Sequence, residues 1–204
     1  MKKVCEDWKQ GFPAGKFGEQ YFAEFERCAK MASAELFRVK TAVEAKEIVA
    51  NIAKFTNAKK VVTVDNPLQK ASGVNEELAN MGIAVYTTTT DIAEHAETAD
   101  IGISSVEFGV AETGSVAMDG YDIGSRLVSM LPPLHIVFLN SNNIVPGVEE
   151  AFEVFSKVFN RGYVSFITGP SRTADIERVL TIGVHGPSRF VVIAVDEEIN
   201  GGAN

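Results

Sequence analysis

The residues best suited to bind an anion follow an apolar run in the last third of the chain. Tyr163–Ile167 is aromatic and β-branched, which is the composition of a buried strand. The turn formers Thr168-Gly169-Pro170-Ser171 come next, and Arg172 adds a forked cation that suits a carboxylate or a phosphate. This order of residues indicates a ligand-binding turn at the end of a strand.

A helix is predicted directly after that turn. Ile176, Val179 and Leu180 recur at three- and four-residue spacing, which places them on one helical face. The N-terminus of this helix would direct backbone N–H groups and the positive end of the helix dipole at an anion above the turn. Strand, turn and helix together predict an anion-binding cradle.

The same residues have a purely structural interpretation. Ser171 or Thr173 can cap the helix, with Asp175 and Glu177 complementing its dipole, as in helices that bind nothing. Neither hydroxyl has Glu or Gln three residues later, and the turn lacks the glycine pattern of a Walker loop or a dinucleotide-binding motif. Both interpretations stay open on the local residues alone.

A second candidate is Glu112, a single carboxylate among the small and apolar residues of Gly109–Ser115. A carboxyl group that is buried in such surroundings has a raised pKa, which would make Glu112 a candidate acid, base or nucleophile. The structural alternative is a turn carboxylate that accepts backbone hydrogen bonds from Gly114 and Ser115.

A third candidate, His185, lies in the segment Gly183-Val184-His185-Gly186-Pro187, just past the end of the predicted helix. The helix dipole favours an imidazolium there, and the glycines allow the loop to approach a ligand. A single loop histidine is more often structural than catalytic. His95 and His135 share no metal-like spacing with it, so no zinc site is predicted.

The elements that must position these residues alternate between strands and helices. Strands are predicted at 35–39, 60–64, 83–86, 99–106, 114–118, 134–139, 163–167 and 190–195. Besides the helix after the turn, helices are predicted at 17–31, 41–55, 68–81, 91–98 and 146–159. Short connections between such elements are typical of a three-layer α/β fold, a mostly parallel sheet with helices on both faces. The strand at 114–118 follows its predecessor too closely for a helical crossover, so a hairpin or an antiparallel strand is expected there.

Apolar spacing predicts which helical faces point inward. The helix at 41–55 is expected to begin at Thr41, with Glu44 as its capping-box partner. Its expected inward residues are Val43, Ile48, Ile52 and Phe55. In the helix at 146–159 they are Val148, Phe152, Phe155 and Phe159. An aromatic stripe on the helix at 17–31 can form either a core face or the seam of a homodimer.

Polar residues follow the predicted strands at their carboxyl ends. Ligands gather beyond these ends in open α/β sheets, and the ends of parallel strands share one edge. We therefore expect these residues to line one site for a small polar or phosphorylated ligand. They are Asp65-Asn66, Thr87–Thr90, Glu107, Asn140-Ser141-Asn142, Thr168–Ser171 and Asp196.

The chain of 204 residues suits a single α/β domain, predicted at 17–204. Residues 1–16 have mixed charge and a Gly-Phe-Pro-Ala-Gly turn, so we expect an arm outside the main sheet that is mobile or packs on a partner subunit. A net charge of −8 without a basic patch argues against nucleic-acid binding. No apolar run approaches the length of a membrane span, and Glu6-Asp7 comes too early for a signal peptide.

Cys5 and Cys28 are the only cysteines, and they lie far apart. Two thiolates cannot hold an iron–sulfur cluster by themselves, so no cluster is expected in this chain. A disulfide between them is permitted but not required, and we predict a protein of the reducing cytoplasm.

Several motifs resemble the lactate utilization protein C (LutC/YkgG) family, whose members carry a LUD domain. They are Ala111-Glu112-Thr113-Gly114, Arg126-Leu127 through Leu131-Pro132-Pro133-Leu134-His135-Ile136, Ile167–Glu177 and Gly183–Pro187. The resemblance runs from about Ile101 to Val195, with the motifs in the order of the family.

The resemblance implies a cytoplasmic protein that acts with partner proteins, at least one of which carries iron–sulfur clusters, in the oxidation of L-lactate to pyruvate. It also implies the α/β fold of the sugar-phosphate isomerase, CoA-transferase and formyltetrahydrofolate cyclo-ligase superfamily (NagB/RpiA/CoA-transferase-like). The alternatives are an independent enzyme of that superfamily's type that uses Glu112, and a scaffold whose polar motifs are all caps and turns.

The candidate residues fall into two groups. The candidate catalytic residues are Glu112 and His185. The candidate residues for a small anion are Thr113, Gly114, Thr168, Gly169, Ser171, Arg172, Thr173, Asp175 and Gly186. We expect the cation, the turn amides, the carboxylate and the imidazole to converge on one pocket.

Overall fold

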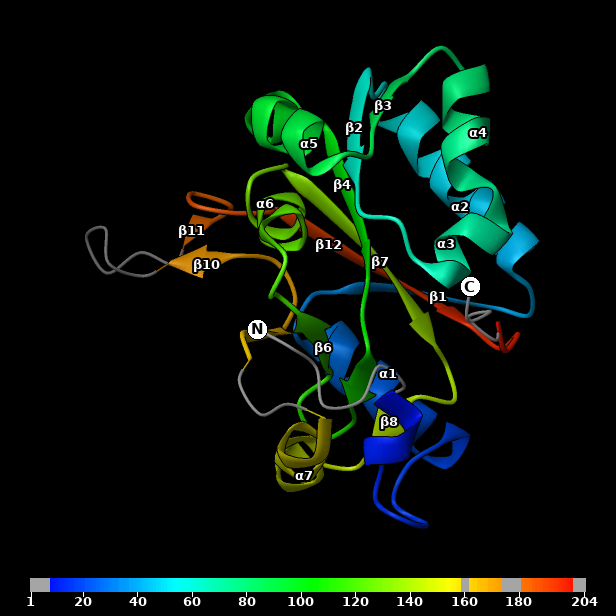
Figure 1. The fold of residues 1–204 in the computed structure, drawn as a ribbon, viewed down its shortest axis with the longest axis vertical. Coiled ribbons are helices and arrows are strands. Elements are labelled where there is room, and N and C mark those ends of the chain that lie inside the picture. The colour runs from blue at the N-terminus through cyan, green and yellow to red at the C-terminus, as the bar shows by residue number, and fades with distance from the viewer. Residues whose placement is uncertain (1–7, 159–161, 174–180, 200–204) are drawn as a thin grey trace.

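A computed structural model describes residues 8–158, 162–173 and 181–199, and a parallel sheet of six strands forms its centre (Figure 1). The strand order is β1-β12-β7-β4-β2-β3, and every neighbouring pair in this sheet is parallel. The strands are β1 (Glu35–Val39), β2 (Lys60–Thr63), β3 (Ala84–Tyr86), β4 (Ile101–Ser105), β7 (Leu134–Asn140) and β12 (Arg189–Val195). The predicted α/β fold with a mostly parallel sheet is confirmed.

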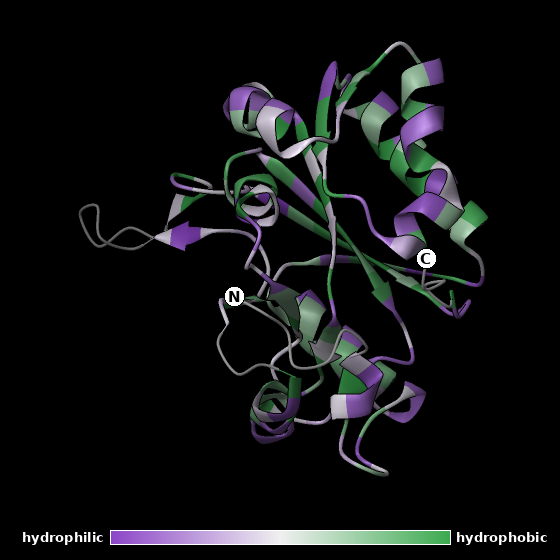
Figure 2. Cartoon of the chain, viewed as in Figure 1, coloured by the Kyte–Doolittle hydropathy of each residue, from purple (hydrophilic) through white to green (hydrophobic). Residues whose placement is uncertain are grey.

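Helices cover both faces of this sheet, which gives the predicted three layers (Figure 1). One face is covered by α2 (Ala42–Phe55), α3 (Pro67–Ser72) and α4 (Val74–Asn80). The other is covered by α1 (Phe22–Met31), α5 (Thr89–His95) with the 3-10 turn η3 (Ala96–Thr98), and α6 (Ile123–Met130). Figure 2 shows the strands between them coloured mainly as hydrophobic.

Strand β7 shows why both faces need cover. Leu134, Ile136 and Phe138 belong to the apolar cluster under α2, whereas Val137 and Leu139 belong to the cluster under α1. Alternate side chains of a strand point to opposite faces, so a strand that is apolar throughout must be buried on both.

A second, four-stranded sheet packs beside the first. Its order is β8-β5-β6-β9, with β5 and β6 forming an antiparallel hairpin. The hairpin that was expected near 114–118 therefore exists, but it belongs to this separate sheet. The strands are β5 (Phe108–Val110), β6 (Ser115–Asp119), β8 (Ile144–Val145) and β9 (Val164–Ile167).

The N-terminal residues pack within this chain. The 3-10 helix η1 (Trp8–Gly11) lies against α7 (Val148–Val158), and the Trp8 side chain is only 5% exposed. Its ring lies 5.9 Å from that of Phe108 in β5. A second 3-10 turn, η2 (Glu19–Tyr21), leads into α1. From Trp8 onward these residues lie outside the six-stranded sheet, but they pack on α7 and the second sheet of the same chain, whereas an arm that is mobile or packs on a partner subunit was expected.

Local signals predicted the bounds of several helices, whereas no helix was predicted at α6. Thr41 caps α2 by accepting a hydrogen bond from the Glu44 backbone N–H, while the Glu44 carboxylate accepts from Lys40 rather than completing the box at Thr41. Gly73 adopts a left-handed conformation, with φ of 69°, and separates α3 from α4. The predicted interruption at Ser72-Gly73 is confirmed.

The helix predicted directly after Ser171 does not begin there. Arg172–Thr173 is a short strand, β10, that pairs antiparallel with β11, Thr181–Ile182. Ile176, Val179, Leu180 and Asp175 lie outside the described residues, so the structure contradicts only a helix that starts at Ser171. Pairing with β11 holds Arg172 and Thr173 in an extended conformation.

Two predicted inward faces were partly wrong. Val43 and Phe55 of α2 are 53% and 88% exposed, and Phe152 of α7 is 59% exposed. Small and β-branched residues face the core instead, namely Ala42, Ala45, Val49 and Ala53 in α2 and Ala151, Val154 and Val158 in α7. These helices pack closely on the strands, so small side chains fit where larger ones do not. Ile48, Val148 and Phe155 are partly buried and Ile52 is buried, as expected, while Phe159 lies outside the described residues.

Two glycines bring the second sheet and the turn after it against α1. Gly114, with φ of 66°, lies so near α1 that a Cβ there would overlap the backbone of Cys28 and Ala29. Gly169, with φ of 71°, is equally close to the carbonyl of Ala32. Both positions therefore require the absence of a side chain as well as a left-handed backbone.

His135 is a fully buried polar residue of β7. Its Nε2 lies 2.9 Å from Oγ of Ser104 in the neighbouring strand β4, and its Nδ1 has no hydrogen-bond partner among the described residues. Burial lowers the pKa of His135 to about 3, so the imidazole is neutral at pH 7.

No helix of the described residues is long and apolar enough to cross a membrane.

Replacing Gly114 with Ala should lower the free energy of unfolding by about 3 kcal/mol, because the new methyl group overlaps α1 in addition to straining the backbone. Gly82→Ala is the matched control: Gly82 also has a positive φ, of 79°, but no atom of the described residues lies within 4 Å of the position that a Cβ would occupy. It should cost only about 1 kcal/mol. Urea unfolding measures both, and equal losses would show that contact with α1 is unimportant.

Acidification should destabilise the protein through His135. The folded-state pKa lies below the unfolded value of about 6.5, so the unfolded state takes up the proton first. The stability from neutral His135 is complete above pH 6.5 and is lost toward pH 3, by about 1.4 kcal/mol per pH unit. Unfolding free energies of the wild type and His135→Phe between pH 8 and pH 4.5 measure this, and parallel pH profiles would contradict it.

Candidate functional site

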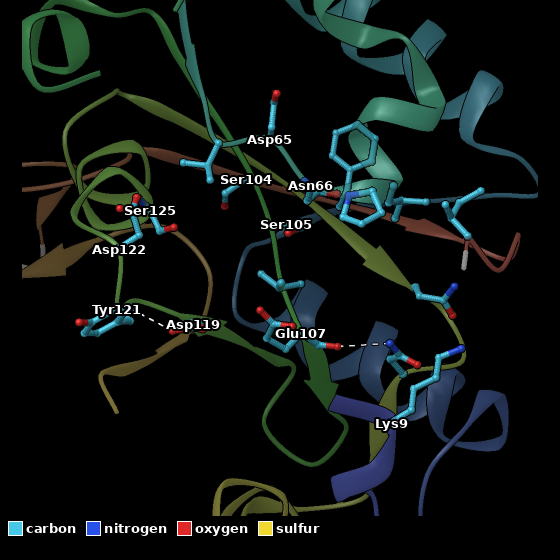
Figure 3. Close-up of a pocket in the computed structure, with 18 residues that line it drawn as sticks. Lys9, Asp65, Asn66, Ser104, Ser105, Glu107, Asp119, Tyr121, Asp122 and Ser125 are labelled. Carbon is cyan, nitrogen blue, oxygen red and sulfur yellow. Dashed lines mark hydrogen bonds between the residues drawn. The ribbon is translucent and has the colours of Figure 1, made fainter. Parts of the chain in front are cut away.

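Polar residues from the carboxyl ends of β2, β4 and β7 meet around a cavity of about 510 Å³, which we call the carboxyl-edge cavity (Figure 3). Asp65 and Asn66 follow β2, Glu107 follows β4, and Asn140 ends β7. These four were expected to share one edge, and they do. Thr168, Gly169 and Ser171, expected at the same edge, line a different cavity.

The opposite wall of the carboxyl-edge cavity comes from outside the six-stranded sheet. Asp119 ends β6, Tyr121 and Asp122 lead into α6, and Ser125 lies in its first turn (Figure 3). Lys9 reaches the cavity from η1. The remaining lining residues are Val64, Pro67, Leu68, Ser104, Ser105, Val106, Phe138, Asn143 and Ile199.

Short-range hydrogen bonds fix several of these polar side chains. Asp122 caps α6, its Oδ2 accepting from the Ser125 backbone N–H at 3.2 Å. Asn66 caps α3 in the same way. Asp65 Oδ1 accepts from Asn75 Nδ2 at 3.0 Å, and the second Asp65 oxygen lies 3.7 Å from Nζ of Lys70. The cavity wall is thus oriented before any ligand arrives.

The chemistry of this wall favours ligands that donate hydrogen bonds. Four carboxylate side chains face one lysine, and the buried Oδ1 of Asn143 has no hydrogen-bond partner among the described residues. Carboxylate and amide oxygens accept hydrogen bonds from hydroxyl and amino groups. No group of three or more His, Cys, Asp or Glu side chains in the described part of the chain is arranged to hold a metal ion.

A second cavity, of about 250 Å³, lies near the amino ends of β7 and β12, and we call it the proline cavity. It contains three of the candidate anion-binding residues, Thr168, Gly169 and Ser171. Its other lining residues are Ser129, His135, Phe166, Ile167, Pro170, Pro187 and Phe190. Thr168 Oγ1 lies 2.6 Å from Ser115 Oγ, which ties this turn to β6.

Arg172 does not line either cavity. Its guanidinium donates hydrogen bonds to the backbone carbonyl of Ala32 and, at 2.9 Å, to Oγ of Ser33, just beyond the end of α1. A cation at a helix C-terminus complements the carbonyls and the dipole there. The structure therefore shows Arg172 holding the turn against α1. Thr173 lies in β10.

Glu112 acts as a helix cap. Its side chain is exposed, and its Oε1 accepts a hydrogen bond from the Val148 backbone N–H at 3.0 Å, at the start of α7. The structural alternative expected donors at Gly114 and Ser115 instead, but Ser115 donates its backbone N–H to Thr113 Oγ1 at 3.3 Å. The carboxylate is thus satisfied by α7, and Thr113 closes the turn.

His185 is exposed in the loop that follows β11. Gly186 in the same loop has φ of 159°, and a side chain there would approach Ser171. Glu112, Arg172 and His185 therefore lie on three different elements, and none lines either cavity. The predicted convergence of these groups on one pocket is not observed.

Sequence reasoning missed several residues of the two cavities. Ser104 and His135 sit inside strands, where their neighbours indicate only a buried sheet. Asp119 and Asp122 flank a turn whose sequence matches no motif that we identified. The one usable signal was positional, because Ser104 and Asp119 stand at or next to the carboxyl end of a strand.

Comparisons with known proteins agree with this fold. A DUF162 family protein from Deinococcus radiodurans, solved by crystallography, has a TM-score of 0.59 at 22% identity, covering 86% of this chain and 96% of that chain. That likeness shows the shared fold.

Sequence relatives show the family. "Lactate utilization protein C" of Geobacillus sp. (strain WCH70) is 31% identical over 77% of this chain and 70% of its own length. "Lactate utilization protein C" of Halalkalibacterium halodurans is 30% identical over 74% of this chain and 69% of its own length. The family model of the LUD domain matches residues 22–195. With most of its length matched by that family model and by these relatives, this chain belongs to the LUD domain family.

Proposed function

We propose that this chain is a component of an L-lactate utilization system in the cytoplasm, working with partner proteins that carry the iron–sulfur clusters. The observation that carries the proposal is the similarity to proteins named "Lactate utilization protein C", which extends over 77% of the chain. The residues matched by the family model include both walls of the carboxyl-edge cavity from β2 to β7.

The division of labour follows from the chemistry of the chain. Oxidation of a 2-hydroxy acid to a 2-oxo acid removes two electrons, which a redox centre must accept. The sequence contains two cysteines, fewer than the four ligands of a common iron–sulfur cluster. We therefore propose that an iron–sulfur cluster that accepts these electrons is held by a partner.

The carboxyl-edge cavity supports a role other than holding free lactate. Its lining includes four carboxylate side chains and one lysine, a set that suits hydrogen-bond donors better than a small monocarboxylate. A cavity of about 510 Å³ also lies in the size range that holds cofactor-like or drug-sized molecules. We propose that it binds a ligand rich in hydroxyl or amino groups, and that lactate itself is handled on a partner.

The alternative of an independent enzyme that uses Glu112 is less well supported. A catalytic carboxylate must reach a substrate, whereas Glu112 is exposed outside both cavities and accepts a hydrogen bond from the start of α7. Capping α7 is a structural role for Glu112 that requires no catalytic function.

Deleting the gene for this chain should abolish growth on L-lactate and leave growth on pyruvate intact, because only the oxidation step is lost. A tagged copy at native level should restore growth and co-purify with a protein that contains iron and acid-labile sulfide. Growth curves and metal analysis measure these outcomes. Unchanged growth on L-lactate, or a chain recovered alone from lactate-grown cells, would refute the proposal.

Two isosteric substitutions distinguish a functional role of the carboxyl-edge cavity from a catalytic role of Glu112. Asp122→Asn keeps a capping oxygen for α6 but removes a cavity charge, which should weaken a bound cation or polyol about tenfold and slow growth on L-lactate. Glu112→Gln keeps the cap of α7 and should support growth at the wild-type rate. Complementation of the deletion strain, with melting temperatures as a folding check, measures both. The reverse pattern would favour the enzyme that uses Glu112.

A further inference from the structure

Arg126 holds the loop that carries one wall of the carboxyl-edge cavity, although its own side chain does not line that cavity. It lies in α6, one turn after the start of the helix. Its Nη1 donates hydrogen bonds to the backbone carbonyls of Gly120, at 2.6 Å, and Tyr121, at 3.3 Å. The loop between β6 and α6 is thus tied to the helix that it enters.

The ring of Tyr163 lies against the same loop. The guanidinium carbon of Arg126 is 5.2 Å from the centre of that ring, a position in which a cation is attracted to an aromatic face. Gly120 donates its backbone N–H to the Tyr163 carbonyl at 2.8 Å, and a Cβ at Gly120 would lie only 2.6 Å from the ring. Tyr163 directly precedes β9, which pairs with β6, so these contacts join the second sheet to α6.

The loop places two carboxylates at the cavity. Asp119 and Asp122 flank the two residues whose carbonyls Arg126 holds, and both line the cavity (Figure 3). Asp119 Oδ1 also accepts a hydrogen bond from the Tyr121 backbone N–H at 3.0 Å, which fixes it to the loop. A shift of the loop would therefore move both carboxylates together.

The opposite wall is fixed by other elements. Asp65 accepts a hydrogen bond from Asn75 of α4, and Asn66 caps α3. We call the residues at the strand ends the strand-end wall and those between β6 and α6 the loop wall. The strand-end wall is Asp65, Asn66, Glu107 and Asn140, and the loop wall is Asp119, Tyr121, Asp122 and Ser125.

We propose that Arg126 is a positioning residue that sets the spacing between the two walls, and so selects ligands with amino or hydroxyl groups at both ends. One end of such a ligand donates to the loop wall and the other to the strand-end wall. A ligand that bridges two sites binds best when its length matches their separation. The inference rests on the proposed function, because it takes the carboxyl-edge cavity as a ligand site.

Aliphatic diamines test the spacing, because each length holds two ammonium groups at a different separation. Isothermal titration calorimetry compares the series from 1,3-diaminopropane to 1,6-diaminohexane with butylamine, which reaches one wall only. Salt at about 150 mM screens weak attraction to the acidic surface. One diamine should bind the wild-type protein about tenfold more tightly than butylamine.

Arg126→Met removes the guanidinium and keeps an apolar side chain of similar length. It should weaken the preferred diamine about tenfold and leave butylamine within about twofold of the wild type, since each wall alone is still present. General loss of structure would weaken both amines alike, so the ratio of the two affinities separates positioning from a merely structural role.

Arg172→Met is the matched control. It removes another guanidinium that donates to a backbone carbonyl, that of Ala32, but Arg172 lies outside the lining of the cavity and the ratio should not change. Melting temperatures report folding. If Arg126→Met does not fold, Tyr163→Leu, which removes the ring beside the guanidinium, should lower the same ratio.

The inference is overturned if the wild type binds no diamine more tightly than butylamine, if Arg126→Met or Tyr163→Leu folds and keeps the preference, or if Arg172→Met loses it as well. These titrations use purified protein, whereas growth on L-lactate tests the proposed function. A deletion strain that fails to grow, together with an unchanged preference in Arg126→Met, overturns this inference only. Normal growth of the deletion strain refutes the proposed function.

Discussion

The burial of β7 between two apolar layers is the constraint on which the rest of the structure depends. Its residues 134–139 are all buried, and its neighbours β12 and β4 run parallel to it over most of its length. Each large apolar side chain fully buried in this way contributes about 1.5–3 kcal/mol. A parallel strand buried on both faces in turn requires crossover helices, which place every strand's carboxyl end at the same edge. The carboxyl-edge cavity is a geometric consequence of that arrangement.

The second sheet and the start of α6 add a second wall at this edge. The loops at the carboxyl edge of a parallel sheet form only one wall of a cavity. Here the end of β6 and the start of α6 form the wall opposite those loops. Gly114 and Gly169 make this possible because they let the second sheet and its following turn approach α1 at backbone distance. Several conspicuous polar residues serve the same docking: Arg172 binds the end of α1, and Glu112 caps α7. Motifs that suggest chemistry in the sequence thus function here as attachments between layers.

The two cavities differ in the charge of their described linings. The carboxyl-edge cavity is acidic and rich in hydrogen-bond acceptors, while no charged side chain among the described residues lines the proline cavity. The described lining of neither cavity offers the paired cations that a small organic anion usually requires. This distribution fits our proposal that the carboxyl-edge cavity binds something other than lactate. The hydrogen bond between Ser104 and His135 is the physical link between the two sites.

Periodicity and local signals in the sequence determined the alternation of strands and helices, the cap at Thr41, the interruption at Gly73 and the meeting of Asp65, Asn66, Glu107 and Asn140 at one edge. These features depend on residues close in sequence or on the general geometry of parallel sheets. Only the tertiary structure decided that the β5–β6 hairpin leaves the main sheet, that Arg172 begins a strand, and that Ser104 meets His135. The reason is that each of these depends on contacts outside the local segment, such as β11 for the strand that Arg172 begins and His135 for Ser104, and the free energy of those contacts outweighs local preference.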